Sequence, residues 1–205
     1  MYPLKLIISP ENWQLYARRR VDPAFRPLRD RVFARDQYAC QFCGFQAREY
    51  QEVINLDQNY RNNRLDNLAT ACCFCAQCSF IESVGKTGYG GGQLIYLPEM
   101  NQVELNSFCH VIFCAMVNGT GYRDTAQTVY RELKNRSPVV EDKFGSETSN
   151  PNIFGQMVLE YEGGERKEIA DLLLKDLRLL PSYAKFKKQL DRWAASAAEE
   201  LASAG

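Results

Sequence analysis

Histidine is almost absent from this chain of 205 residues, which contains only His110. Imidazole is the side chain best suited to proton transfer near neutral pH, and it is the commonest metal ligand in proteins. Chemistry that needs several histidines, such as a catalytic pair or a metal site built mainly from imidazole, is therefore excluded.

The chain also lacks an excess of either charge, because 25 lysines and arginines balance 25 aspartates and glutamates. Proteins that coat nucleic acid normally carry a basic excess, so this balance argues against that role. The charge is unevenly distributed, however, since residues 1–35 contain eight basic and three acidic side chains. A solvated surface explains this stretch more simply than a phosphate-binding face, although both interpretations stay open.

Long hydrophobic runs are missing as well. No apolar stretch approaches the roughly 20 residues that span a bilayer. The short run from Leu4 to Ile8 is followed by Pro10 and is too brief for the core of a signal peptide. We therefore expect a cytoplasmic protein, in which thiols stay reduced and clustered cysteines indicate metal binding rather than disulfides.

Cysteine, in contrast, is abundant and clustered. Six of the eight cysteines lie close together in sequence, namely Cys40, Cys43, Cys72, Cys73, Cys75 and Cys78. Two residues between cysteines let a tight turn point both sulfur atoms at one ion, and two such pairs complete the tetrahedral shell of a structural zinc. The first pair is Cys40 and Cys43, whereas the second is either Cys72 with Cys75 or Cys75 with Cys78. The spacing thus predicts one structural zinc ion and leaves its fourth ligand open.

Periodicity and capping signals predict an α+β chain that is mostly helical. Helices are expected over residues 10–20, 27–36, 100–117, 122–134, 168–179 and 182–202. Strands are expected over residues 2–8 and 93–97, with a hairpin over residues 49–56 and a glycine-rich loop over residues 85–92. Residues 137–152 are the best candidate for a linker between a zinc-binding domain (1–136) and a C-terminal helical region (153–205). Cys109 and Cys114 fall in an apolar helix, where we expect core residues.

Two runs of the sequence resemble the zinc-stabilised HNH endonucleases. RVFARDQYACQFCG, at residues 31–44, is similar to the arginine-rich helix and first cysteine pair of that family, and DNLATACCFC, at residues 66–75, is similar to the second pair. The resemblance implies an HNH-nuclease-like ββα zinc core embedded in the helical domain. It also implies that Cys72 and Cys75 complete the site, with Cys78 as the alternative to Cys72.

The catalytic histidines of that family are missing here. The segment EVINLD, at residues 52–57, stands where the family has a histidine that activates water, and Ala76 follows the last cysteine of the motif. An amide such as that of Asn55 cannot accept a proton near neutral pH. Asp57 alone is more simply a turn residue than a metal ligand. We therefore expect no enzymatic activity.

Over its full length the chain resembles an HNH-like component of the Dot/Icm type IVB secretion system of intracellular bacterial pathogens. The resemblance is carried by MYPLKL at residues 1–6, the histidine-free core, and YLPEMNQ at residues 96–102. It implies a non-catalytic zinc-binding adaptor, without a small-molecule substrate, that binds the C-terminal extension of the coupling ATPase DotL. It also implies assembly with DotM and IcmS–IcmW at the cytosolic face of the inner membrane, where effectors are recruited. The alternative is a nucleic-acid-binding protein derived from an HNH nuclease, with the arginines of residues 18–35 on the phosphates.

The sequence does not fix the partner-binding surface. Aromatic anchors near the cysteine pairs are one possibility, although some of these residues must belong to the core: Tyr38, Phe42, Phe45 and Tyr60. The other is the amphipathic C-terminal helix, in which Phe186 and Trp193 are expected to turn inward.

Overall fold

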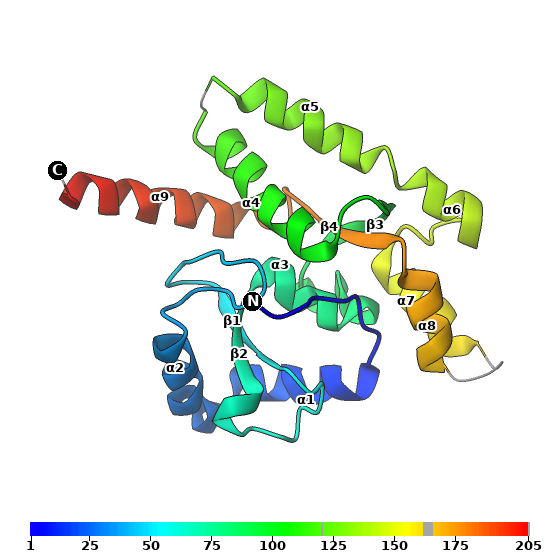
Figure 1. Cartoon of the computed structure of the whole chain (residues 1–205), viewed down its shortest axis with the longest axis horizontal. Coiled ribbons are helices and arrows are strands. Elements are labelled where there is room, and N and C mark those ends of the chain that lie inside the picture. Colours follow the sequence, from blue (N-terminus) through cyan, green and yellow to red (C-terminus); the bar gives the residue numbers. More distant parts are fainter. Residues whose placement is uncertain (120, 162–165, 205) are drawn as a thin grey trace.

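The computed structural model describes residues 1–119, 121–161 and 166–204 (Figure 1). Its helices are α1 (Pro10–Val21), α2 (Arg26–Arg35), α3 (Cys73–Ala76), α4 (Gln102–Val117), α5 (Arg123–Lys134), α6 (Pro138–Phe144), α7 (Pro151–Glu160), α8 (Arg166–Leu174) and α9 (Lys187–Ala204). Its strands are β1 (Gln51–Asn55), β2 (Leu68–Cys72), β3 (Gly92–Tyr96) and β4 (Leu177–Pro181), with short 3-10 turns between several elements. The predicted α+β class is confirmed.

The first two helices begin where local signals place them. Pro10 occupies the first turn of α1 and Glu11 follows it, while the arginines of residues 18–20 complement the negative end of the helix dipole. In α2, Val32 and Phe33 are buried against the strands β1 and β2. Helix α2 thus packs on the first sheet, and α1 reaches it through the hydrogen bond from Arg19 to the carbonyl of Val53; both helices lie in the lower half of Figure 1.

Strands β1 and β2 form the first antiparallel pair, in which Gln51 lies opposite Cys72 and Asn55 lies opposite Leu68. The hairpin expected over residues 49–56 is therefore wrong in extent, because only its first strand lies there. The connection is long, and the buried side chain of Asn55 organises it by donating to the backbone carbonyls of Asn59 and Asn62. Helix α3 follows β2 without a break.

Strands β3 and β4 form a second antiparallel pair from distant parts of the chain. The helix expected over residues 168–179 instead ends at Leu174, and residues 177–181 form β4. A leucine-rich run fits either state, and pairing with β3 decides between them because Leu177 and Leu179 become buried in the sheet. Residues 2–8 form no strand. They run extended, and the backbone of Ile7 bonds to Cys78 and Ile81.

The segment expected to be a linker, residues 137–152, contains α6 and the start of α7. Val140 on α6 is completely buried. Helix α7 was not predicted. Its Gly155 lies so close to the backbone of Glu82 that a Cβ there would meet the Glu82 Cα at 2.6 Å, so glycine permits this packing. The division of the chain into domains stays a prediction.

Besides the small cluster that joins α2 to the first sheet, two large hydrophobic clusters fill most of the interior of the described chain. The larger is rich in aromatic rings and surrounds α3, with Tyr16, Phe74, Phe80 and Phe113 among its members. The smaller is mostly aliphatic and lies between the second sheet and helices α6, α7 and α8. Helix α4 contacts α3, α5, α9 and β4, and therefore runs between the two regions (Figure 1).

Candidate metal centre

Four cysteines converge between the first sheet and α4. The Sγ atoms of Cys40, Cys43, Cys72 and Cys75 all lie within 4.8 Å of one another. The Sγ atoms of Cys43 and Cys72 are 3.6 Å apart. A tetrahedral zinc site with its usual bond lengths places sulfur atoms about 3.8 Å apart, so the four thiols fit such an ion. The cluster could bind a metal ion.

Cys78, the alternative to Cys72, lies outside this group. Its Sγ donates to the backbone carbonyl of Phe74 at 3.3 Å. The structure thus brings together the ligand set that the HNH resemblance implied, and it gives Cys78 another contact. Of the two cysteines expected in the core, Cys109 is buried as predicted, but Cys114 is exposed, so the expectation was wrong there.

Local backbone structure presents each pair. Cys40 and Cys43 lie on a turn after α2, in which the N–H of Gly44 donates to the carbonyl of Cys40 at 2.9 Å. Gly44 has a φ of +77°, a conformation that glycine adopts without strain. The N–H of Gln41 joins this turn to β2 by donating to the carbonyl of Thr70. The second pair lies at the junction of β2 and α3.

Burial and mutual hydrogen bonding shift the pKa of Cys40 in one direction and those of Cys72 and Cys75 in the other. Hydrogen bonding by the Cys43 thiol, with further contributions from Cys72 and Cys75, lowers the pKa of Cys40. Burial raises the pKa of both Cys72 and Cys75 well above the usual range of a thiol. Burial therefore favours the protonated forms of Cys72 and Cys75, and a bound cation would be needed to stabilise them as thiolates.

Helix α4 places two polar side chains against this cluster. The Nε2 atom of His110 lies 3.3 Å from the Sγ of Cys72, and the Nδ2 of Asn106 donates to the Sγ of Cys75 at 3.2 Å. Sequence reasoning missed both residues, because they lie far from the cysteines along the chain. Their only signal was a spacing of four residues, which places two polar side chains on one face of the helix.

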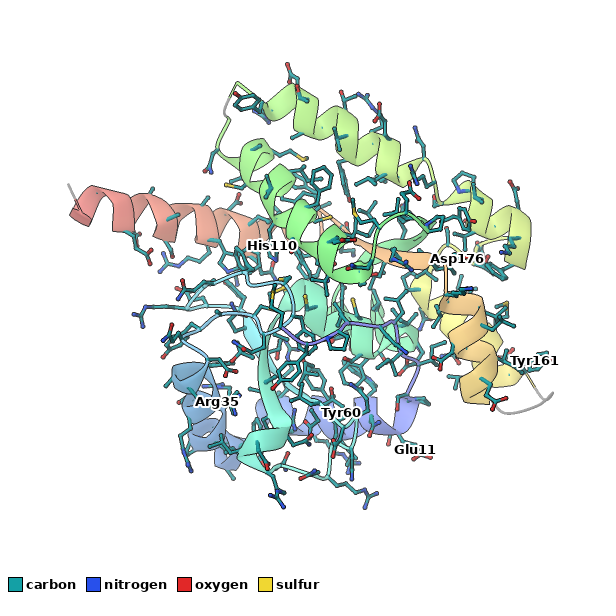
Figure 2. All side chains as sticks on the ribbon, viewed as in Figure 1. Glu11, Arg35, Tyr60, His110, Tyr161 and Asp176 are labelled. Atoms are coloured by element: carbon teal, nitrogen blue, oxygen red, sulfur yellow. The ribbon has the colours of Figure 1, made fainter. Side chains whose placement is uncertain are left out.

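The ring of His110 is enclosed by aromatic side chains. It stacks on Phe45, with centroids 3.7 Å apart, and on Phe74, with centroids 4.3 Å apart. Trp193 of α9 lies against the same group. Burial lowers the pKa of His110 to about 3, so the imidazole is neutral at physiological pH. Figure 2 labels His110 at the centre of the molecule, on α4.

The two polar residues considered in the segment of residues 52–57, Asn55 and Asp57, make structural contacts. Asn55 is fully buried, and its Oδ1 accepts a hydrogen bond from Arg19 at 2.5 Å. The carboxylate of Asp57 accepts hydrogen bonds from the side chains of Asn62 and Asn67. Asp57 is thus held within the β1–β2 connection as a turn residue.

Several arginines of residues 18–35 are also engaged within the protein. Arg19 is only 8% exposed, and besides Asn55 it donates to the carbonyl of Val53 at 2.7 Å. Arg20 pairs with Glu52 at 2.7 Å. Arg35 donates to the carbonyls of Leu65 and Leu68 and pairs with Asp36. These contacts leave a smaller free basic face than the sequence alone suggested.

The aromatic candidates for partner binding divide into two groups. Phe42 and Tyr60 are 5% and 3% exposed and belong to the core. Tyr38 and Phe45 are partly exposed. Two residues of the predicted C-terminal helix were expected to turn inward. Phe186, directly before α9, is buried, whereas Trp193 on α9 is partly exposed and donates its Nε1–H to the carbonyl of Glu49.

A groove lies beside this tryptophan. It has a volume of about 460 Å³ and is bounded by α4, by α9 and by residues 45–49. Its apolar wall includes Phe45, Val117, Ala194 and Ala197, and charged side chains such as Arg48 and Glu199 border it. None of the described helices is long and apolar enough to cross a membrane.

Fold and site together define a class: a small α+β protein organised around a four-cysteine cluster that could hold a metal ion. No family model matches the chain. Type 4 apparatus protein DotN of Legionella pneumophila subsp. pneumophila strain Philadelphia 1 is 60% identical over 199 residues, which make up 97% of this chain and 92% of that relative. The chain therefore belongs to the DotN family, and its resemblance to this family is confirmed.

Proposed function

We propose that this chain is a non-catalytic, zinc-binding adaptor of a type IVB secretion coupling complex. The observation that carries the proposal is the 60% identity, over nearly the full length of both chains, to a protein named as a type 4 apparatus component. The cysteine cluster and the groove beside α9 supply the chemistry that such a role needs.

Zinc is the metal that the ligand set favours. Four thiolates in a tetrahedral arrangement are typical of structural zinc, and a closed shell of protein ligands leaves no position for a substrate. In our proposal β1, β2 and α3 form an HNH-like ββα core around the ion. Metal analysis of purified protein should find one zinc per chain. Substoichiometric metal with four freely titrating thiols in the cluster would contradict the proposal.

The contacts of Asn55 and Asp57 support the proposed absence of catalysis. Neither residue presents a base to a bound water, because both side chains are held by hydrogen bonds within the protein. We expect no cleavage of plasmid DNA with Mg²⁺, Mn²⁺ or Ni²⁺. Cleavage by a purified sample, lost in an Asp57→Ala variant, would show that this site has been misinterpreted.

The internal engagement of Arg19, Arg20 and Arg35 disfavours the alternative of a nucleic-acid-binding protein. The balanced net charge of the chain points the same way. Binding to DNA that survives physiological ionic strength, and weakens steeply as salt rises, would revive the alternative.

The proposed partner is the C-terminal extension of the coupling ATPase DotL, with DotM and IcmS–IcmW in the same assembly. Such partners would keep the chain in the cytoplasm at the inner face of the inner membrane. We place the ATPase tail in the groove between α4 and α9, because an apolar wall with a charged rim fits a helix or an extended segment. Partly exposed aromatic residues, here Phe45 and Trp193, are typical anchors for such a segment.

Calorimetry with the isolated tail peptide tests this placement. We expect a Kd in the nanomolar to micromolar range that salt weakens only mildly, because apolar contacts dominate the groove. Ala197→Arg fills the groove and should weaken binding at least about tenfold. Leu172→Arg, on an exposed position of α8 outside the groove, is the matched control.

This experiment has three outcomes, each with a different meaning for the proposal. Loss of binding in Ala197→Arg but not in Leu172→Arg supports the groove. Equal binding by both variants moves the tail to another surface and keeps the adaptor. No heat and no shift at high protein concentration removes the adaptor proposal.

A further inference from the structure

We infer that His110 and Asn106 are hydrogen-bond donors to two metal-binding thiolates, and that they make the docking of α4 depend on the bound metal. The inference rests on the proposed metal site and goes beyond it. It assigns a role to two residues of α4 and links the metal to the groove where the partner segment is proposed to bind.

The first support is the geometry of Asn106. Its side chain is completely buried, and its Nδ2 lies 3.2 Å from the Sγ of Cys75. The opposite atom, Oδ1, accepts a hydrogen bond from the Nε2 of Gln102 at 2.9 Å. Since Gln102 occupies the oxygen, the amide must present its N–H₂ group to the sulfur.

Gln102 is itself fixed by the second sheet. Its Oε1 accepts the backbone N–H of Leu179 at 2.8 Å, and its Nε2 donates to the carbonyl of the same residue at 2.9 Å. A continuous chain of hydrogen bonds therefore runs from β4 through Gln102 and Asn106 to Cys75.

The second support is the enclosure of His110. Its Nε2 lies 3.3 Å from the Sγ of Cys72, one helical turn beyond Asn106. Flat stacking between Phe45 and Phe74 holds the ring in this orientation. The two donors thus face the same cluster from one side of α4 and reach one thiol of the second cysteine pair each.

The buried charge of the proposed metal site explains why these hydrogen bonds matter. Four thiolates around a divalent cation leave a buried net charge of about −2, which donors directed at the sulfur atoms stabilise. Loss of an outer hydrogen bond to a metal ligand typically costs about 10- to 100-fold in metal affinity. Without the ion nothing holds the four sulfur atoms at these positions, so α4 loses part of its attachment to the cluster.

Loss of the metal should also affect the groove, because His110 is one of the residues that line it. Phe45 stacks on one face of His110 and also contacts Trp193, with centroids 4.6 Å apart. Trp193 in turn donates to the carbonyl of Glu49 in the segment that follows the first cysteine pair. Movement of that segment or of α4 would therefore change the surroundings of Trp193.

Metal release to a chromophoric chelator tests the donors. His110→Phe keeps the aromatic stack and removes the N–H, and Asn106→Leu keeps the approximate volume and removes the amide. Each should release zinc at least about tenfold faster than wild type, and His110→Gln, which restores an amide N–H, should fall between. Val111→Ala, at an exposed position of the same helix, should match wild type. Fully loaded His110→Phe and Asn106→Leu proteins that release zinc at the wild-type rate would overturn the inference.

A second measurement uses the wild-type protein, so it stays informative if a variant does not fold. In intact protein loaded with ¹¹³Cd, scalar correlations from the metal to the His110 ring N–H and the Asn106 amide should cross the two hydrogen bonds. Loaded protein without either correlation would refute the donor assignment. Protein that binds no cadmium would instead overturn the metal site itself, and the inference with it, so the two failures are distinguishable.

Tryptophan fluorescence tests the link to the groove. Trp13 lies in a separate aromatic group with Tyr16 and Tyr89, so a Trp13→Phe background isolates Trp193. Chelation of the metal should shift the Trp193 emission to longer wavelength as its surroundings open. An emission spectrum unchanged by complete metal removal would overturn the coupling.

Discussion

The two β pairs of this molecule are stabilised in different ways. β1 and β2 lie close in sequence and lead directly into the cysteine cluster, and fixed polar contacts such as that of Arg19 with Asn55 surround them. β3 and β4 come from residues more than 80 positions apart and are covered mainly by aliphatic side chains. The first region is specified by the cysteine cluster and by directed hydrogen bonds, and the second by apolar volume.

Helix α4 is where the two regions meet. Gln102 near its N-terminus bonds to β4, whereas Asn106 and His110 contact the cysteines. Because the two regions are stabilised differently, a substitution that unfolds one should leave most of the other folded. The exception is an effect that α4 transmits from one region to the other.

Loss of a metal ligand should have the largest effect. A structural zinc contributes about 10 kcal/mol or more to the folding of small modules, which exceeds the usual stability of a domain. Cys40→Ser should therefore unfold mainly residues 38–83, while β3 and β4 keep their protection in hydrogen exchange. Unchanged protection of residues 38–83 would show that the cysteines are not structural ligands. Loss of protection everywhere would show that the two regions unfold as one unit.

Proton release should accompany metal binding to the wild-type protein. Burial raises the pKa of Cys72 and Cys75, so both are protonated at pH 7 before the ion binds. Binding deprotonates them, and apparent affinity should rise with pH. Titration in weakly buffered solution should detect at least these two protons per ion, and a metal affinity independent of pH would contradict the assignment.

The second region should respond to a cavity in its core. Phe154 on α7 is completely buried in the aliphatic cluster, so Phe154→Ala should cost about 3–5 kcal/mol of unfolding free energy. Phe144→Ala, which removes a less buried neighbouring ring, should cost less. Urea unfolding measures both. Metal content should stay complete in each variant, and zinc loss in Phe154→Ala would break the distinction between the regions.

The contrast between the two regions also explains which features could be predicted from the sequence. The spacing of the cysteines predicted a metal site because ligand geometry is local, and α1, α2, α4 and α5 carry their own periodicity and capping signals. β4 was missed because the run around Leu179 fits a helix as well as a strand, and only its distant partner decides. Helices α6 and α7 were missed because their prolines and the intervening polar residues suggested a linker. His110 and Asn106 became functional candidates only when the fold placed α4 over the cysteines.

A substitution at Gln102 tests whether α4 connects the second sheet to the cysteine cluster. Gln102→Met keeps the volume but leaves the buried N–H and carbonyl of Leu179 without these hydrogen bonds, which should cost about 2–4 kcal/mol. The variant also frees the oxygen of Asn106, so zinc release should accelerate. Gln93→Met, which removes a single exposed side-chain hydrogen bond, is the control. Stability lost without any change in zinc release would show that the bond to Asn106 does not orient its amide.

The smallest of these effects concerns Glu82, which lies where α7 packs against the short turn of residues 81–83. Its Oε2 accepts the backbone N–H of Ser9, while its Oε1 has no hydrogen-bond partner among the described residues. Burial raises the pKa of this carboxyl to about 7, from an ordinary value near 4.5. A buried acid of this kind opposes folding once it must ionise.

The direction of the pH effect follows from proton binding in the two states. Below the ordinary pKa both states hold the proton, and Glu82 has no influence on stability. As pH rises toward 7 the unfolded chain loses the proton first, so the folded state binds more protons and stability falls. Glu82→Gln keeps an acceptor for Ser9 and should remove this decline, which makes it about 1–3 kcal/mol more stable than wild type at pH 8. Glu132→Gln, at an exposed position of α5, is the control. Denaturation curves measured from pH 4.5 to pH 8 decide the matter: if wild type and Glu82→Gln lose stability in parallel, ionisation of Glu82 does not limit the packing of α7.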